Sequence, residues 1–176
     1  LVCLVGSEMC IRDRINANLL SSKLHEIGGN EANVAIGYHA IEFLLWGQDL
    51  NGTQKGSGNR AYTDFNLKDC TNNNCDRRRE YLLAASQLLI KDLEYIHSVW
   101  YSEGQARLDL LNDKENGIKR ILIGMGSLSY GELAGERMKL GLMLHDPEEE
   151  HDCFSDNTHN SHSVSYTHLR AHETHE

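Results

Sequence analysis

Proline occurs only once in the 176 residues of this chain, at Pro147, and this scarcity constrains the fold more than any other feature. A proline inside a helix removes a hydrogen bond and clashes with the preceding turn, so its absence permits long helices elsewhere. Hydrophobic residues recur at helical spacing over much of the chain, whereas few segments show the strict alternation of β-strands. The sequence therefore predicts an all-α protein, built as a helical bundle.

Two segments in the second half of the chain show clear helical periodicity. The first begins near Asp76, the expected N-cap, and its large side chains lie on one stripe: Leu82, Leu89, Leu93, Ile96 and Trp100. We expect this stripe to pack in the core of the bundle. The second begins near Gly117 and has further glycines at positions 124, 126, 131 and 135. Because each glycine weakens a helix by roughly 1 kcal/mol, they predict a broken or closely packed helix.

The segment from Glu31 to Asp49 reads as a helix with two chemically distinct faces. At about 100° per residue, an arc of roughly 80° around His39 collects the acidic side chains and two neighbours: Glu31, Ala35, Glu42, Trp46 and Asp49. The remaining arc is broad and apolar, so we expect the helix to be buried on most sides. His39 and Glu42 are three residues apart, so the ring nitrogen and the carboxylate oxygens can converge on one point.

This convergence has two interpretations. A charged side chain in a buried helix is unfavourable unless it is paired or binds a cation. One interpretation is therefore a metal site with His39 and Glu42 as ligands. The other is a histidine that is hydrogen-bonded to a neighbouring carboxylate in a core. The spacing alone favours neither interpretation.

A second block of the sequence carries a further concentration of polar groups. It begins with Gly131–Met138 and continues through His145–His159, which is rich in histidine, aspartate and glutamate. The motif Gly37-x-His39-x-x-Glu42 followed by this block resembles the imelysin family, which includes insulin-cleaving and iron-regulated proteins of bacterial envelopes. The resemblance spans roughly Ile15 to His162. It implies a fold of two helical bundles, with the second block facing the first near the motif.

Both ends of the chain fall outside this resemblance. Residues 1–14 and 164–176 resemble peptides translated from sequencing-adapter DNA, and we predict that they are not native. The apolar run Leu1–Val5 is too short for a secretory signal and is followed by charged residues. We therefore expect an imelysin-like domain over residues 15–163, containing parts of two bundles, as an internal fragment whose targeting signal lies outside it.

Composition limits the classes of partner. The formal net charge is -9, from 26 acidic and 17 basic residues, which disfavours nucleic acid as a ligand. No apolar run reaches the roughly 18 residues that a transmembrane helix needs. Three of the ten histidines and two of the five cysteines lie in the two ends that we predict to be non-native, so the histidine-rich tail does not indicate a metal site.

A long loop rich in Gly, Asn, Thr and Ser spans Asn51–Asn74. Loops of more than about 12–15 residues are often functional, and in the family this loop follows the motif helix, so it is a candidate to line the site. Cys70 and Cys75 bracket four of its residues. Two cysteines alone make an incomplete zinc site, and in the oxidising envelope that the resemblance implies we expect a disulfide.

Three functions are open, and the resemblance implies the first two. The leading one is binding of iron, zinc or copper by His39 and Glu42 in a periplasmic or outer-membrane-associated protein of iron uptake or regulation, with envelope iron-uptake components as possible partners. The second is a zinc metallopeptidase that acts on a peptide substrate. Against it, the chain lacks His-Glu-x-x-His, which supplies two zinc ligands and a base. The third is a helical binding module without a metal.

Further site residues are predicted from the loop and from the second block: Asp49, Arg60, Glu136, Arg137, His151, Ser155, Asp156 and His159. From charge alone, the acidic run after Pro147 is more typical of a solvated loop or helix start than of a ligand cluster. Ser155, Asp156 and His159 also have the residue types of a serine triad. Their nearness in sequence does not establish triad geometry.

Overall fold

We analysed a computed structural model of the whole chain, in which residues 36–52, 54–145 and 149–171 are described. Within these ranges the chain is helical and contains no β-strand, which confirms the all-α prediction. The first part of the predicted helix, Glu31–Ala35, and the single proline, Pro147, lie outside the described residues. Every helix of the described ranges is too short or too polar to cross a bilayer.

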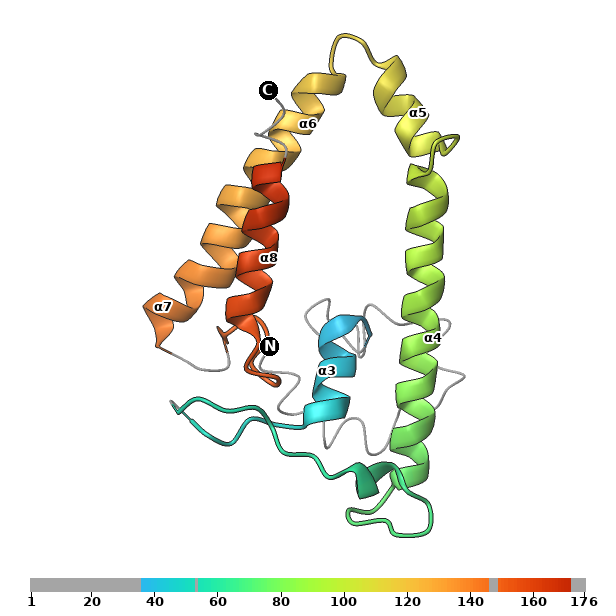
Figure 1. Cartoon of the computed structure of the whole chain (residues 1–176), viewed down its shortest axis with the longest axis vertical. Coiled ribbons are helices and arrows are strands. Elements are labelled where there is room, and N and C mark those ends of the chain that lie inside the picture. The colour runs from blue at the N-terminus through green and yellow to red at the C-terminus, as the bar shows by residue number, and fades with distance from the viewer. Residues whose placement is uncertain (1–35, 53, 146–148, 172–176) are drawn as a thin grey trace, which may run out of the picture. The chain divides into compact units, whose positions relative to one another are not determined.

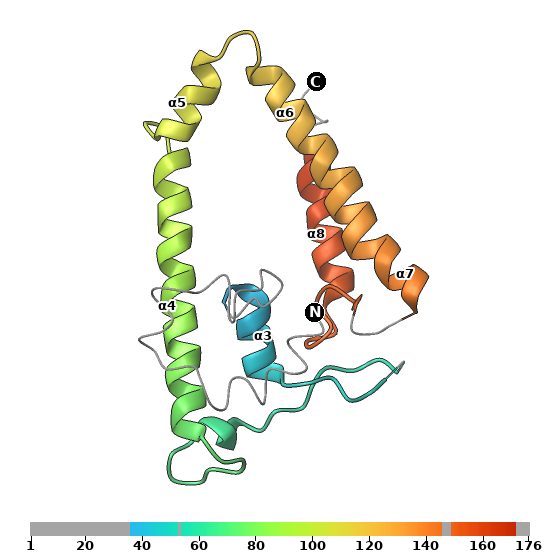
Figure 2. The same cartoon turned by 180° about the vertical axis from the view of Figure 1, so that it is seen from behind.

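The described part of the chain divides into two compact units. The first holds residues 36–92 together with Phe154–Asp156, and the second holds residues 93–153 and 157–171. The helical segments, coloured in chain order in Figures 1 and 2, are α3 (Tyr38–Trp46), η2 (Tyr62–Phe65), α4 (Cys75–Trp100), α5 (Gln105–Asn112), α6 (Gly117–Gly126), η3 (Ser127–Lys139), α7 (Leu140–Leu144) and α8 (Thr158–Ala171).

Glycines set both ends of α3. Gly37 has φ 87° and ψ -168°, and Gly47 has φ 77° and ψ -171°. Only glycine adopts this region of φ/ψ space readily, which gives a physical reason for glycine at the first position of the motif. The helix that we predicted as far as Asp49 therefore ends at Trp46. Asp49 does not share a helical face with His39, and its carboxylate instead accepts hydrogen bonds from the backbone and side chain of Asn51, each 2.7 Å long.

The described core of the first unit lies between α3 and the first half of α4. Ile36, Leu44 and Tyr81 form a buried cluster, against which Leu82, Ala84 and Leu88 pack. Within α3 the side chains of Ala40, Glu42, Phe43 and Leu44 are buried, whereas Tyr38, Leu45 and Trp46 are exposed. The expectation that this helix is buried on most sides is thus correct for only one side.

The long helix α4 begins at Cys75, one residue before the expected N-cap Asp76. Its buried residues are Cys75, Tyr81 and Ala85. The predicted core stripe is wrong for its second half, because Leu93, Ile96 and Trp100 are each about half exposed, at 45%, 52% and 49%. Helical periodicity shows which side chains share a face, but burial also needs an element that covers the face.

Burial raises the pKa of Tyr81 from 10.0 to about 12, and this predicts a loss of stability at high pH. Below pH 10 both the folded and the unfolded chain keep the phenol proton. Between pH 10 and 12 the unfolded chain releases it while the folded chain retains it, so the free energy of unfolding falls by about 2–3 kcal/mol.

Urea denaturation between pH 9 and 12 tests this expectation. Trp46 reports on the first unit once the other tryptophan is removed by Trp100→Phe. In the same background, Tyr81→Phe should lack this part of the pH dependence. An identical decline in both proteins would show that Tyr81 does not contribute.

In the second unit one continuous helix runs from Gly117 to Leu144 through α6, η3 and α7. Its middle part, η3, is π-helical, and at its end the Leu140 N–H donates to the carbonyl of Gly135, five residues earlier. Such windings rarely exceed one turn. The glycines that predicted a break therefore lie in or beside a segment of altered winding. Figures 1 and 2 both show α8 alongside this helix, and α8 contacts η3.

Candidate metal site

The carboxylate of Glu42 is the centre of the candidate site in the first unit. Its side chain is 10% exposed, and Oε2 lies 3.2 Å from Nδ1 of His39, whose side chain is 40% exposed. Two ligand atoms that each lie about 2.0–2.2 Å from one metal ion, at angles of roughly 90–110°, are separated by about 2.9–3.5 Å. The observed separation therefore allows both atoms to bind a single ion.

Ser155 holds the other oxygen of the same carboxylate. Its backbone N–H donates to Glu42 Oε1 over 2.9 Å, and its hydroxyl donates to the same atom over 2.6 Å. These bonds connect residues that are 113 positions apart in the sequence. Hydrogen bonds of this kind fix the orientation of a ligating carboxylate and satisfy the oxygen that faces away from the metal.

Three contacts dock the segment Phe154–Asp156 onto the first unit. The ring of Phe154 meets the ring of Phe43 edge-on at a centroid distance of 5.0 Å. The Phe154 carbonyl accepts a hydrogen bond from Gly58 N–H over 2.8 Å, and Asp156 Oδ2 accepts one from Gly56 N–H over 2.9 Å. The long loop therefore helps to position Ser155 beside Glu42.

A buried ion pair also supports α3. Arg60 Nη1 lies 3.4 Å from Asp64 Oδ2, and the two side chains are only 7% and 2% exposed. The guanidinium carbon of Arg60 lies 5.6 Å from the centre of the Phe43 ring, and the Arg60 N–H donates to the carbonyl of Trp46 over 2.9 Å. Arg60 thus contacts α3 through both its backbone and its side chain.

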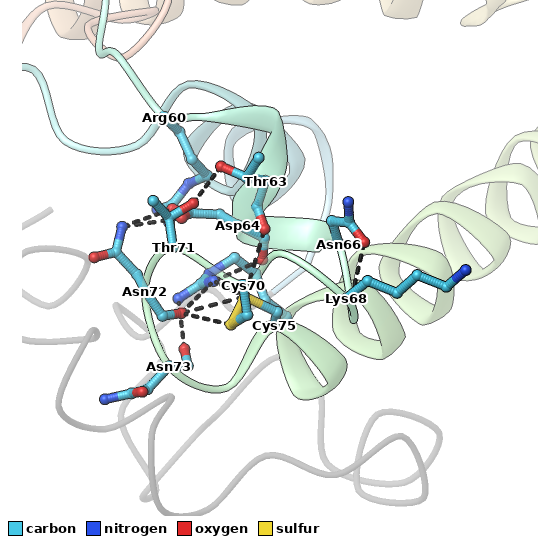
Figure 3. The surroundings of a disulfide bond; sticks show 11 residues. Arg60, Thr63, Asp64, Asn66, Lys68, Cys70, Thr71, Asn72, Asn73 and Cys75 are labelled. Carbon is cyan, nitrogen blue, oxygen red and sulfur yellow. Dashed lines mark hydrogen bonds and ion pairs between the residues drawn. A yellow bond between two sulfur atoms is a disulfide. The ribbon is translucent and has the colours of Figure 1, made fainter.

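A small disulfide-closed loop completes this network, as Figure 3 shows. Cys70 and Cys75 are joined by a disulfide, and between them Asn72 Nδ2 donates to both carboxylate oxygens of Asp64, over 2.9 and 3.1 Å. Arg78 of α4 donates to the backbone carbonyls of Asp64, Asn72 and Asn73. The loop is therefore fastened both to the buried carboxylate and to the start of α4.

The other predicted site residues lie in different surroundings. In the second unit His151 Nδ1 lies 3.0 Å from Asp152 Oδ1, and the hydroxyl of Ser161 bonds the same carboxylate. Arg137 pairs with Glu132 at 2.9 Å. Glu136 and His159 are exposed on η3 and α8.

Ser155 and Asp156, which have the residue types of a serine triad, bond to other partners here. The Ser155 hydroxyl donates to Glu42, and the Asp156 carboxylate accepts from the backbone of Gly56. Neither of these two bonds joins a serine to a histidine or a histidine to an aspartate, as a triad requires. Ser155 therefore orients Glu42, the candidate metal ligand.

Sequence reasoning missed the partners Gly58, Asp64 and Asn72 as parts of the site's support. Asp64 follows Arg60 by four residues, a spacing that favours an ion pair within one helical turn, and this signal was available. Asn72 and Gly58 carried no comparable signal, because their roles depend on contacts across the loop.

Comparison with known families gives one match. The model of the imelysin family, which is named as a family of peptidases, matches residues 10–171. The matched range includes residues 10–14 and 164–171, and the non-native origin of the two ends stays a prediction. No curated protein matches the chain at a significant level.

Proposed function

Because this chain belongs to the imelysin family, we propose that it binds a metal ion through His39 and Glu42 and acts in iron uptake or iron-dependent regulation in a bacterial envelope. The two oxygens of the Glu42 carboxylate have different partners, and this observation supports the proposal most directly. Ser155 occupies Oε1, while Oε2 lies at chelating distance from His39. An imidazole nitrogen and a carboxylate oxygen suit iron, zinc and copper.

His39 and Glu42 supply two ligands, and a stable site needs more. Water molecules or further nitrogen and oxygen ligands would complete the coordination of an ion held by this pair.

Metal analysis and calorimetric titration with Zn²⁺ and Fe²⁺ test the proposal on the full chain. We expect near-stoichiometric binding by the wild type and loss of that binding in His39→Ala and Glu42→Ala. Ser155→Ala should bind roughly 10–100-fold more weakly, the usual effect of removing a partner that orients a ligand.

Exposed residues of α4 provide matched controls. His97→Ala and Glu94→Ala remove the same side-chain types from an exposed surface and should leave affinity unchanged. Equal metal content in wild type, His39→Ala and Glu42→Ala would contradict the proposal.

The family's peptidase name supports a second proposal, zinc-dependent peptide cleavage at the same site. In that case chelator, His39→Ala and Glu42→Ala should each abolish insulin cleavage. Cleavage that survives all three treatments would point to a contaminating protease. The arrangement favours metal binding over peptidase chemistry, because both Glu42 oxygens are already engaged and neither is available as a general base.

A further inference from the structure

The loop closed by the disulfide is hydrogen-bonded to a buried carboxylate, that of Asp64. Asn72 lies between Cys70 and Cys75, and its side-chain amide donates to both oxygens of Asp64, which is 1% exposed. Opening this short loop gives Asn72 many more conformations, so the entropy cost of placing its amide on Asp64 increases. The disulfide therefore controls how firmly the Asp64 carboxylate is held.

The next contacts lead from Asp64 to α3. Arg60 is buried, pairs with Asp64 and lies over the Phe43 ring. A buried guanidinium that loses the alignment of its carboxylate must find another partner or move toward water. Either response withdraws the support that Arg60 gives to Phe43, which follows Glu42 directly in α3.

The last contacts lead from Phe43 to the candidate ligand. Phe43 packs against Phe154, and the residue after Phe154 is Ser155, which makes two hydrogen bonds to Glu42. A shift of the Phe43 ring therefore acts on Glu42 twice, through α3 itself and through the segment that carries Ser155. All of these residues belong to the first unit.

We propose that the Cys70–Cys75 disulfide tunes the metal affinity of the His39–Glu42 site, with Asn72 as the positioning residue that transmits the effect. This inference rests on the proposed metal-binding function. A dithiol reductant would attack the exposed Cys70 sulfur and release the Cys75 thiolate, since Cys75 is only 2% exposed. The second thiol of the reductant then completes the exchange, so that both cysteines become thiols and the reductant becomes a disulfide.

Serine variants provide the cleanest test, because cysteine thiols freed by reduction would themselves bind zinc. In Zn²⁺ titrations of the full chain, we expect the double variant C70S/C75S to bind about tenfold more weakly than the wild type. Asn72→Ala, which keeps the disulfide, should lose a similar factor. Adding Asn72→Ala to C70S/C75S should cause little further loss, because both changes act through the same contact.

Asn73→Ala is the matched control. Among the described residues Asn73 contacts this network through its backbone carbonyl, which accepts from Arg78, so its side chain should be dispensable. Wild-type affinity in both C70S/C75S and Asn72→Ala would overturn the inference while leaving the proposed function intact. A wild-type chain that binds no metal, or that binds equally well after His39→Ala, would overturn the proposed function and the inference with it.

A readout without metal separates positioning from unfolding. The Ser155 amide donates to Glu42, so its hydrogen exchange should accelerate in C70S/C75S and in Asn72→Ala but not in Asn73→Ala. The Tyr81 amide, in the first half of α4, should keep its protection if the unit stays folded. Unchanged exchange at Ser155 in both test variants would contradict the coupling directly.

Discussion

Replacing Asp64 by alanine is expected to lower the free energy of unfolding of the first unit by about 3–5 kcal/mol. The change removes one partner of a buried ion pair and leaves the Arg60 guanidinium, 7% exposed, without its carboxylate. It also removes the acceptor of two hydrogen bonds from Asn72. Removing one buried charge costs far more than removing an exposed pair, because the remaining charge stays in a poorly solvated position.

Denaturation followed by Trp46 fluorescence in a Trp100→Phe background measures this loss in the relevant unit. Asp69→Ala is the control, since Asp69 is exposed and accepts a 3.3 Å hydrogen bond from Asn66. We expect the control to change stability by no more than about 0.5 kcal/mol. A loss below about 1 kcal/mol for Asp64→Ala would show that the pair is far better hydrated than its burial indicates.

The second large effect is expected at Gly58, where alanine should cost about 3 kcal/mol. An added Cβ would lie 2.4 Å from the Trp46 carbonyl oxygen and 2.6 Å from that of Gly47. Both neighbours are backbone atoms at the end of α3, so no flexible side chain can move aside. The loop must instead shift away from the helix, which weakens the Gly58 N–H bond to Phe154.

Gly58→Ala should therefore affect both stability and the candidate site. The same fluorescence measurement gives the stability, and a Zn²⁺ titration shows whether displacement of Phe154 and Ser155 lowers affinity. Ser57→Ala, the neighbouring position, changes a side chain without adding bulk against α3 and should be nearly neutral. A Gly58→Ala protein as stable as Ser57→Ala would mean that the close approach to Trp46 is absent.

The sequence predicts the closeness of His39 and Glu42 well because their relation is local. Three residues on one helix fix their separation, whatever surrounds the helix. The position of Ser155 was less predictable: its residue type marked it as a candidate, but its two bonds to Glu42 depend on a contact over 113 residues. No local pattern specifies such a contact.

The boundaries of the elements were predicted less well than their type. The predicted helix extends across Gly47 to Asp49, yet α3 ends at Trp46 because Gly47 adopts a positive φ and Arg60 donates to the Trp46 carbonyl. The stripe on α4 has the right periodicity, but Ile96 and Trp100 are half exposed. Helix propensity and apolar spacing indicate which segments can form a helix. Contacts with neighbouring elements determine where the helix ends and which of its faces is buried.

The asymmetry of the Glu42 carboxylate bears on ion selectivity. With Oε1 saturated by two donors from Ser155, only Oε2 remains to face an ion beside His39, so under the proposed function Glu42 would bind an ion through one oxygen. Calcium prefers six to eight oxygen ligands and often takes both oxygens of a carboxylate, whereas zinc and iron accept one oxygen and a nitrogen. The two hydrogen bonds from Ser155 would thus disfavour calcium binding, whatever the other ligands of the ion are.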